Sequence, residues 1–142
     1  MHGITVVDDY AHHPTEIRAT LSAARAAYPS NRLIAVFQPH LYSRTRDFAT
    51  DFGAALAGAD LVWVTDVYAA REAPLPGITG ELVAQAADRA QARRVQYEPE
   101  LERINERLLG ELKSGDVVVF MGAGSIDGVA RELADRLGDV SA

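Results

Sequence analysis

The architecture of the chain can be read from Val6-Val7-Asp8-Asp9-Tyr10-Ala11-His12-His13-Pro14-Thr15-Glu16. An apolar strand ends in two carboxylates, an aromatic ring and two histidines, and a proline then begins a helix. Open α/β sheets bind their ligands outside the carboxyl ends of the strands. The stretch therefore predicts both a strand–turn–helix unit and a binding site at its turn.

A second polar cluster follows the next apolar run, at Gln38-Pro39-His40-Leu41-Tyr42-Ser43-Arg44-Thr45-Arg46-Asp47. The run before it, residues 33–37, is continuously apolar, which is typical of a strand buried on both faces. We interpret the two clusters as adjacent strand ends that form a single site.

Strand and helix patterns alternate along the rest of the chain. Strands are predicted over residues 3–8, 33–37, 61–65, 94–97 and 117–121, and helices over residues 14–28, 43–57, about 79–90, 101–112 and 126–137. Ile17, Leu21, Ala24 and Tyr28 should face the sheet, and Phe48, Phe52 and Leu56 share one helical stripe. The alternation predicts an α/β fold with a mostly parallel sheet and helices on both faces.

Composition limits the classes of function. The chain has 142 residues, 48% of them hydrophobic, which predicts one domain over residues 1–142 with a sizeable core. The net charge of −6, without a block of Lys or Arg, argues against nucleic acid or an anionic membrane as partner. The chain has no cysteine, no long apolar run and no signal-peptide pattern, and a cytoplasmic location fits these features. A strand almost at residue 1 suggests a domain cut from a longer protein.

The first cluster has a functional and a structural interpretation. Asp9 either accepts hydrogen bonds from a ligand, such as ribose hydroxyls, or caps the turn that it begins. One of His12 and His13 either donates to a ligand or carries a proton, while the alternative is a cap and a surface residue. Metal binding is not expected, because histidine ligands on a helix need a spacing of three or four.

In the second cluster, Arg44 and Arg46 lie about 200° apart on a helix, so only one is expected to reach a ligand. Arg44 follows the strand more closely and offers a planar fork suited to a carboxylate or phosphate. Arg46 is the better candidate for a surface ion pair, with Asp47 or Asp51. His40 is either a ligand contact or a satisfied structural residue.

A glycine-rich turn, Gly122-Ala123-Gly124-Ser125, follows the last strand. Such a turn either lets a backbone approach an anion or allows close packing, and close packing is favoured here because the G-x-G-x-x-G spacing is not met. The sequence contains no G-x-x-x-x-G-K-S/T phosphate loop and no G-x-S-x-G nucleophile motif.

Together, these motifs resemble the C-terminal domain of the Mur ligases. The resemblance is carried by the two polar clusters, by Asp66-Val67-Tyr68-Ala69-Ala70 and by Gly122-Ala123-Gly124-Ser125-Ile126, in the family's order. It implies a Rossmann-like three-layer αβα sandwich with a sheet of about six strands. It also implies part of an ATP- and Mg²⁺-dependent ligase of peptidoglycan synthesis, whose N-terminal UDP-sugar domain and central ATPase domain are absent.

By the same resemblance, Asp9 contacts the nucleotide, and Tyr10, His12, His40 and Arg44 line the amino-acid side of the site. No catalytic residue and no metal ligand are expected in this domain alone, and the isolated domain is expected to be inactive. The second cluster is most similar to the branch that joins L-alanine to UDP-N-acetylmuramate, although Leu41 replaces the arginine common there. A murein-peptide recycling ligase and a self-contained nucleotide-binding module are the alternatives.

Overall fold

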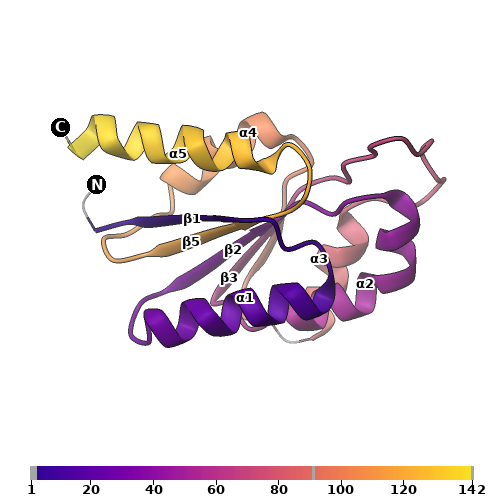
Figure 1. Cartoon of the computed structure of the whole chain (residues 1–142), viewed down its shortest axis with the longest axis horizontal. Helices are drawn as coiled ribbons and strands as arrows, with labels where there is room; N and C mark the ends of the chain where they lie inside the picture. The colour runs from indigo at the N-terminus through magenta and orange to yellow at the C-terminus, as the bar shows by residue number, and fades with distance from the viewer. Residues whose placement is uncertain (1–2, 91, 142) are drawn as a thin grey trace.

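The computed structural model describes residues 3–90 and 92–141, so expectations for residues 1–2, 91 and 142 lie outside the described residues. Strands and helices alternate as predicted (Figure 1). The strands are β1 (Thr5–Asp9), β2 (Leu33–Phe37), β3 (Leu61–Val64), β4 (Val95–Tyr97) and β5 (Val117–Met121). The helices are α1 (Pro14–Ala27), α2 (Tyr42–Leu56), α3 (Glu81–Arg89), α4 (Leu101–Leu109) and α5 (Ile126–Ser141).

The strands form one parallel sheet in the order β1-β5-β2-β3-β4. The predicted α/β fold is confirmed. Within the described residues the sheet has five strands rather than about six. The sequence itself contains five strand-like runs, and the higher number came from the resemblance alone.

The position of β5 corrects one expectation. The last strand of the chain pairs with both β1 and β2, so the two strands that precede the polar clusters are not neighbours in the sheet. Their carboxyl ends are nevertheless level, because Asp9 and Phe37 are both in register with Met121 of β5. The polar turns after β1 and β2 therefore begin at the same edge of the sheet.

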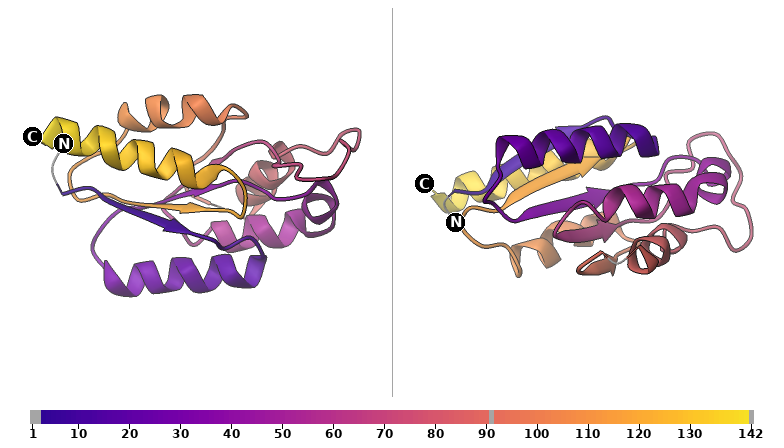
Figure 2. Two further views of the ribbon diagram at one scale, coloured as in Figure 1. Left: turned by 45° about the horizontal axis from the view of Figure 1, so that its top comes forward. Right: turned by 90° about the horizontal axis from the view of Figure 1, so that it is seen from below.

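Helices cover both faces of the sheet, which gives the predicted three layers. Helices α1, α2 and α3 lie on one face, and α4 and α5 lie on the other (Figures 1 and 2). Successive residues of β2 and β5 alternate between the two cores, and every residue of both strands is buried. This arrangement explains their continuous apolar sequence, since neither face meets water.

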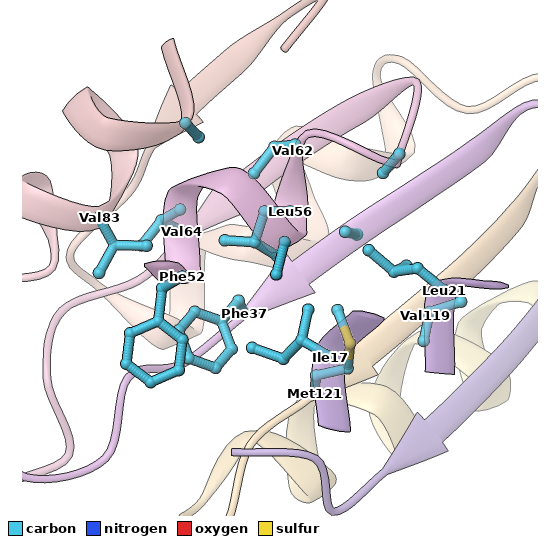
Figure 3. Packing of buried hydrophobic residues seen from close by; sticks show 14 of the residues in the cluster. Ile17, Leu21, Phe37, Phe52, Leu56, Val62, Val64, Val83, Val119 and Met121 are labelled. Carbon is cyan, nitrogen blue, oxygen red and sulfur yellow. The ribbon is translucent and has the colours of Figure 1, made fainter. Parts of the chain in front are cut away.

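Apolar side chains from the sheet and from α1, α2 and α3 interlock in the larger core (Figure 3). Phe37 of β2 and Phe52 of α2 pack with ring centroids 5.0 Å apart. Ile17 and Leu21 of α1 are buried as predicted, and Tyr28 packs against the same core. The core therefore fixes both helices that begin at the polar turns.

Phe48 departs from the helical stripe expected for α2. Phe52 and Leu56 are fully buried, whereas Phe48 is 41% exposed. Phe48 faces a groove between α2 and the start of α1, which Pro14 and Arg18 also line. Helical periodicity places the three residues on one side of α2, but the sheet covers only part of that side.

None of the helices in the described ranges combines the length and the apolar character needed to cross a membrane.

Candidate functional site

The turn after β1 is organised by Asp9. Its Oδ1 accepts the amide of Ala11 at 2.8 Å, and its carbonyl accepts the amide of Gly122 at 3.2 Å. One carboxylate oxygen thus stabilises the turn, as the structural interpretation predicted. No hydrogen bond to Oδ2 occurs within residues 3–90 and 92–141, so this oxygen can still accept from a ligand.

Glu16 caps the start of α1. Its Oε1 accepts the amides of His12 at 3.1 Å and His13 at 3.0 Å, two donors that the helix itself cannot satisfy. The amide of His12, followed by that of His13, holds the pKa of Glu16 below its usual range, although burial opposes the shift. Pro14 at the first helical position needs no such partner.

His12 points across the sheet edge toward the second cluster. Its Nδ1–H donates to the carbonyl of Tyr10 at 2.8 Å, which leaves Nε2 to contact a ligand. The His12 ring meets the ring of Tyr10 edge-on at 5.1 Å and that of His40 at 6.1 Å. Tyr10 is 70% exposed, so its ring is available to form a wall of the site.

The described residues contain one group of three side chains that could ligate a metal, namely His12, His13 and Glu16, with donor atoms within 4.8 Å of one another. His13 and Glu16 are exposed. Glu16 Oε1 and His12 Nδ1 already have hydrogen-bond partners on the backbone. The absence of a metal ligand here remains a prediction.

An Arg–His pair links the turn after β2 to the first turn of α2. Arg44 Nη1 donates to His40 Nδ1 at 3.1 Å. Burial, and then the positive charges of Arg44 and His12, lower the pKa of His40, while Glu72 opposes them. A neutral His40 can accept from Arg44 at Nδ1 and keep its proton on Nε2. The pair therefore orients the guanidinium, whose other N–H groups can bind a carboxylate.

Arg46 takes the role expected of a surface residue. Its Nε donates to Asp47 Oδ1 at 2.9 Å, and both side chains are 54% exposed. The hydrogen bond to Asp47, and then the negative charge of Asp47, raise the pKa of Arg46. Although Arg44 and Arg46 share a helix, only Arg44 lies beside His40.

The two clusters meet even though β5 separates their strands. The first three residues after β5 are Gly122, Ala123 and Gly124, so no long side chain stands between the flanking turns. The rings of His12 and His40 come within 6.1 Å of each other beside this turn of small residues. The expectation of a single site is compatible with this geometry, but the cause is the small turn after β5 rather than adjacency of β1 and β2.

The glycine-rich turn itself is closely packed. A Cβ at Gly124 would lie 2.5 Å from the Tyr68 ring and 2.8 Å from Gln38 Oε1. Gln38, only 3% exposed, accepts the amide of Ile126 at 3.2 Å and donates to Ser125 Oγ at 3.2 Å. Gln38 thus occupies an amide at the start of α5 that an anion would otherwise use, which favours the packing interpretation.

Two residues of the loop between β3 and α3 belong to the site but had no predicted role. The Tyr68 ring stacks on His40, with centroids 5.7 Å apart and planes 16° apart. Glu72 accepts the amide of Ser43 at 3.0 Å and also the Ser43 hydroxyl, at the start of α2. The length of this loop and the Asp66–Ala70 motif were the sequence signals, but neither says which side chain reaches which turn.

Leu41, the position that departs from the commoner arginine, has an unusual backbone. Its φ of 71° is rare for a residue with a branched side chain. Its amide donates to the Tyr68 carbonyl at 2.9 Å, and its carbonyl accepts from Thr45 through both the amide and the hydroxyl. Contacts on both sides therefore maintain a conformation that costs free energy.

Comparison with known proteins gives matches over most of the chain. Residues 1–124 match the family described as Mur ligase, glutamate ligase domain. A UDP-N-acetylmuramate–L-alanine ligase from Chlorobaculum parvum is 48% identical over 140 residues, which cover 97% of this chain and 30% of the relative. The chain thus spans about 30% of the length of the curated relatives it matches.

Solved structures share the fold. The UDP-N-acetylmuramate-alanine ligase MurC from Thermotoga maritima aligns with a TM-score of 0.78 and 27% identity, covering 96% of this chain and 27% of that one. A crystallised domain of a UDP-N-acetylmuramate:L-alanyl-γ-D-glutamyl-diaminopimelate ligase from Haemophilus ducreyi aligns with a TM-score of 0.71 and 27% identity. This alignment covers 95% of the chain and 92% of the domain.

Proposed function

The chain belongs to the family of Mur ligase domains described as the glutamate ligase domain. We propose that it is the amino-acid-binding and closure domain of a UDP-N-acetylmuramate–L-alanine ligase. The complete polypeptide would use ATP to convert the UDP-N-acetylmuramate carboxylate into an acyl phosphate. The amine of L-alanine would then attack the acyl carbon, forming an amide and releasing phosphate. This reaction belongs to peptidoglycan synthesis, and we propose a cytoplasmic location for it.

One observation carries the assignment of this domain's role, namely the hydrogen bond between Arg44 and a neutral His40. The bond holds the guanidinium at the carboxyl edge of the sheet, where it can pair with the carboxylate of alanine. His12 lies beside His40 and can offer Nε2 to the same ligand. Tyr10, which is largely exposed, would form the outer wall.

Asp9 is proposed to contact the nucleotide when the domains close. Its Oδ2 oxygen has no hydrogen bond within the described residues and can accept one from a ribose hydroxyl. The residues present do not fit the phosphates of ATP. Gln38 occupies the amide of Ile126, and the sequence has no phosphate loop. ATP and Mg²⁺ are therefore assigned mainly to the central domain of the complete polypeptide, and no step here depends on them.

The sequence left two alternative functions open. A self-contained nucleotide-binding module is disfavoured because Tyr68 and Gln38 fill the space over Gly124. A murein-peptide recycling ligase would use a peptide in place of L-alanine. Supplying the complete polypeptide with L-alanine or with the peptide, and detecting the products by mass spectrometry, separates the two ligases.

The role of Arg44 is tested by Arg44→Ala in the complete ligase. Loss of hydrogen bonds between two charged groups costs about 1.5 to 3 kcal/mol, so we expect the KM for L-alanine to rise by roughly 10- to 100-fold. The KM for ATP should change little. Arg46→Ala is the matched control, because Arg46 pairs with Asp47 at the surface. An unchanged alanine KM in Arg44→Ala would exclude the carboxylate role.

A further inference from the structure

The loop between β3 and α3, residues 65–80, forms hydrogen bonds with the turn after β2 and with the start of α2. Tyr68 exchanges backbone hydrogen bonds with this turn, since its amide donates to Pro39 at 2.8 Å and its carbonyl accepts from Leu41 at 2.9 Å. Glu72 binds the amide and hydroxyl of Ser43, one turn before Arg46. The contacts flank His40 at Pro39 and Leu41 and end at Ser43, the residue before Arg44.

The side chain of Tyr68 also contacts the turn after β5. Its ring stacks on His40, and Gly124 in the turn after β5 approaches the ring so closely that a Cβ there would lie 2.5 Å from Cγ. The ring is therefore held by the β5 turn while it contacts the imidazole. Its exposure of 38% is high for an aromatic residue with so many contacts, so the ring also borders the open edge of the site.

The backbone conformation of Leu41 needs stabilising contacts of this kind. A φ of 71° is unfavourable for leucine, and the conformation persists only where its surroundings impose it. The Tyr68 carbonyl is one of the groups that impose it, through the amide of Leu41. Without the loop, the turn carrying His40 would have a more favourable conformation available.

We propose that Tyr68 is a positioning residue, whose ring, supported by Gly124, fixes the imidazole of His40 and thereby aims the guanidinium of Arg44. Tyr68 acts through His40 and is not assigned a contact with the reacting atoms. The part of the proposal that concerns alanine rests on the proposed function, whereas the part that concerns His40 does not.

The titration of His40 supplies a readout that ordinary destabilisation does not change. The charged or titratable groups that face His40 are Arg44 on α2, His12 in the turn after β1, and Tyr68 and Glu72 in the loop. Burial is the largest cause of its lowered pKa, and the Tyr68 ring contributes to that burial by stacking. Removing the ring should expose the imidazole to water and release it from Arg44.

The first experiment follows His40 by NMR in the 142-residue chain. In the wild type we expect a midpoint below 6.5 and the tautomer with the proton on Nε2. Tyr68→Phe should keep both, since it keeps the ring. Tyr68→Ala should raise the midpoint toward 6.5 and mix the tautomers. An unchanged midpoint and tautomer in Tyr68→Ala would overturn the proposal.

A second variant guards against loss of packing. Because alanine also removes the contact with Gly124, Tyr68→Leu restores much of the side-chain volume but lacks the aromatic plane. It should reproduce the His40 changes of Tyr68→Ala. If Tyr68→Leu instead behaves like Tyr68→Phe, the ring has no positioning role and the proposal fails.

The second experiment measures the complete ligase. Tyr68→Leu should raise the KM for L-alanine about tenfold, with kcat and the KM for ATP within about twofold of the wild type, because only the aim of Arg44 changes. Tyr68→Phe should restore the wild-type KM. If the leucine variant alters His40 in the NMR experiment but leaves the alanine KM unchanged, the positioning of His40 stands and the proposed amino-acid site is overturned.

Discussion

Asp8 and Asp9 are consecutive carboxylates with different surroundings, because successive side chains of a strand point to opposite faces. Asp9 bonds to the amide of Ala11 in the turn before α1. Asp8 lies near α5, where burial, and then the negative charge of Asp127, raise its pKa, while Arg131 opposes the shift. One strand end thus presents one acid toward the proposed site and one away from it.

This contrast provides a test of the nucleotide contact. Asp9→Asn keeps an oxygen that can accept from the amide of Ala11 but removes the charge. The variant therefore distinguishes the role of Asp9 in the turn from its role in binding a ligand. In the complete ligase we expect about a tenfold rise in the apparent KM for ATP, or an equal loss of turnover. Asp8→Asn is the matched control. Wild-type kinetics in Asp9→Asn would leave Asp9 with the turn as its only role.

The individual residues of the site differ in how far the sequence could predict them. Arg44 could be separated from Arg46 because helix geometry alone places them on different sides, and the surface pair between Arg46 and Asp47 is confirmed. Tyr68 and Gln38 could not be assigned, because their partners lie on other elements of the sheet edge. Short-range spacing carries no information about such contacts.

At the scale of elements, the two buried strands were the most predictable part. Residues 33–37 and 117–121 form β2 and β5 with the predicted bounds, since strands covered on both faces must be apolar at every position. Their order in the sheet was not predictable. Placing β5 between β1 and β2 depends on packing between distant segments, and the alternation of strands and helices is the same for several orders.

Asp60 links three elements through a single carboxylate. Its Oδ2 accepts from Arg25 of α1 at 3.0 Å and from the amide of Leu33, the first residue of β2, at 2.8 Å, just before β3 begins. Burial alone would raise the pKa of Asp60, but these two donors outweigh it and lower the pKa below 3.8. The unfolded chain therefore binds this proton more readily than the folded chain.

The sign of the pH dependence follows from that difference. The contribution of Asp60 is fully present above about pH 5 and disappears as the pH falls through 3.8 and below. We expect Asp60→Asn to lower the free energy of unfolding by about 1 to 2 kcal/mol at pH 7, measured by urea denaturation. The difference from the wild type should shrink below about pH 4.

Asp51→Asn is the control for this prediction. Asp51 is exposed on α2 and makes no ion pair within the described residues. The same change of charge there should leave the free energy of unfolding nearly unaltered, both at pH 7 and below about pH 4. A constant difference between Asp60→Asn and the wild type from pH 7 to pH 3 would contradict the proposed linkage.

At the scale of the whole molecule, the structure supports independent folding, and we propose that ligation needs the complete polypeptide. Two cores lie on opposite faces of one sheet, and the aligned Haemophilus ducreyi domain, 92% of which this chain covers, was crystallised as a domain. The proposed site, by contrast, lies at the open edge of that sheet, where Tyr10 is 70% exposed. Such an edge can bind one substrate group but cannot exclude water from a reacting acyl phosphate.

We therefore expect the 142-residue chain to unfold in a single cooperative transition, with circular dichroism and tryptophan fluorescence giving the same midpoint, because Trp63 is buried in the sheet. The same sample should form no amide from UDP-N-acetylmuramate, L-alanine and ATP, since no phosphate loop is present to hold ATP. The complete polypeptide, assayed in parallel, shows that the substrates are competent. Product formed by the 142-residue chain alone would contradict the division of labour proposed here, and two separate unfolding midpoints would contradict its description as one cooperative domain.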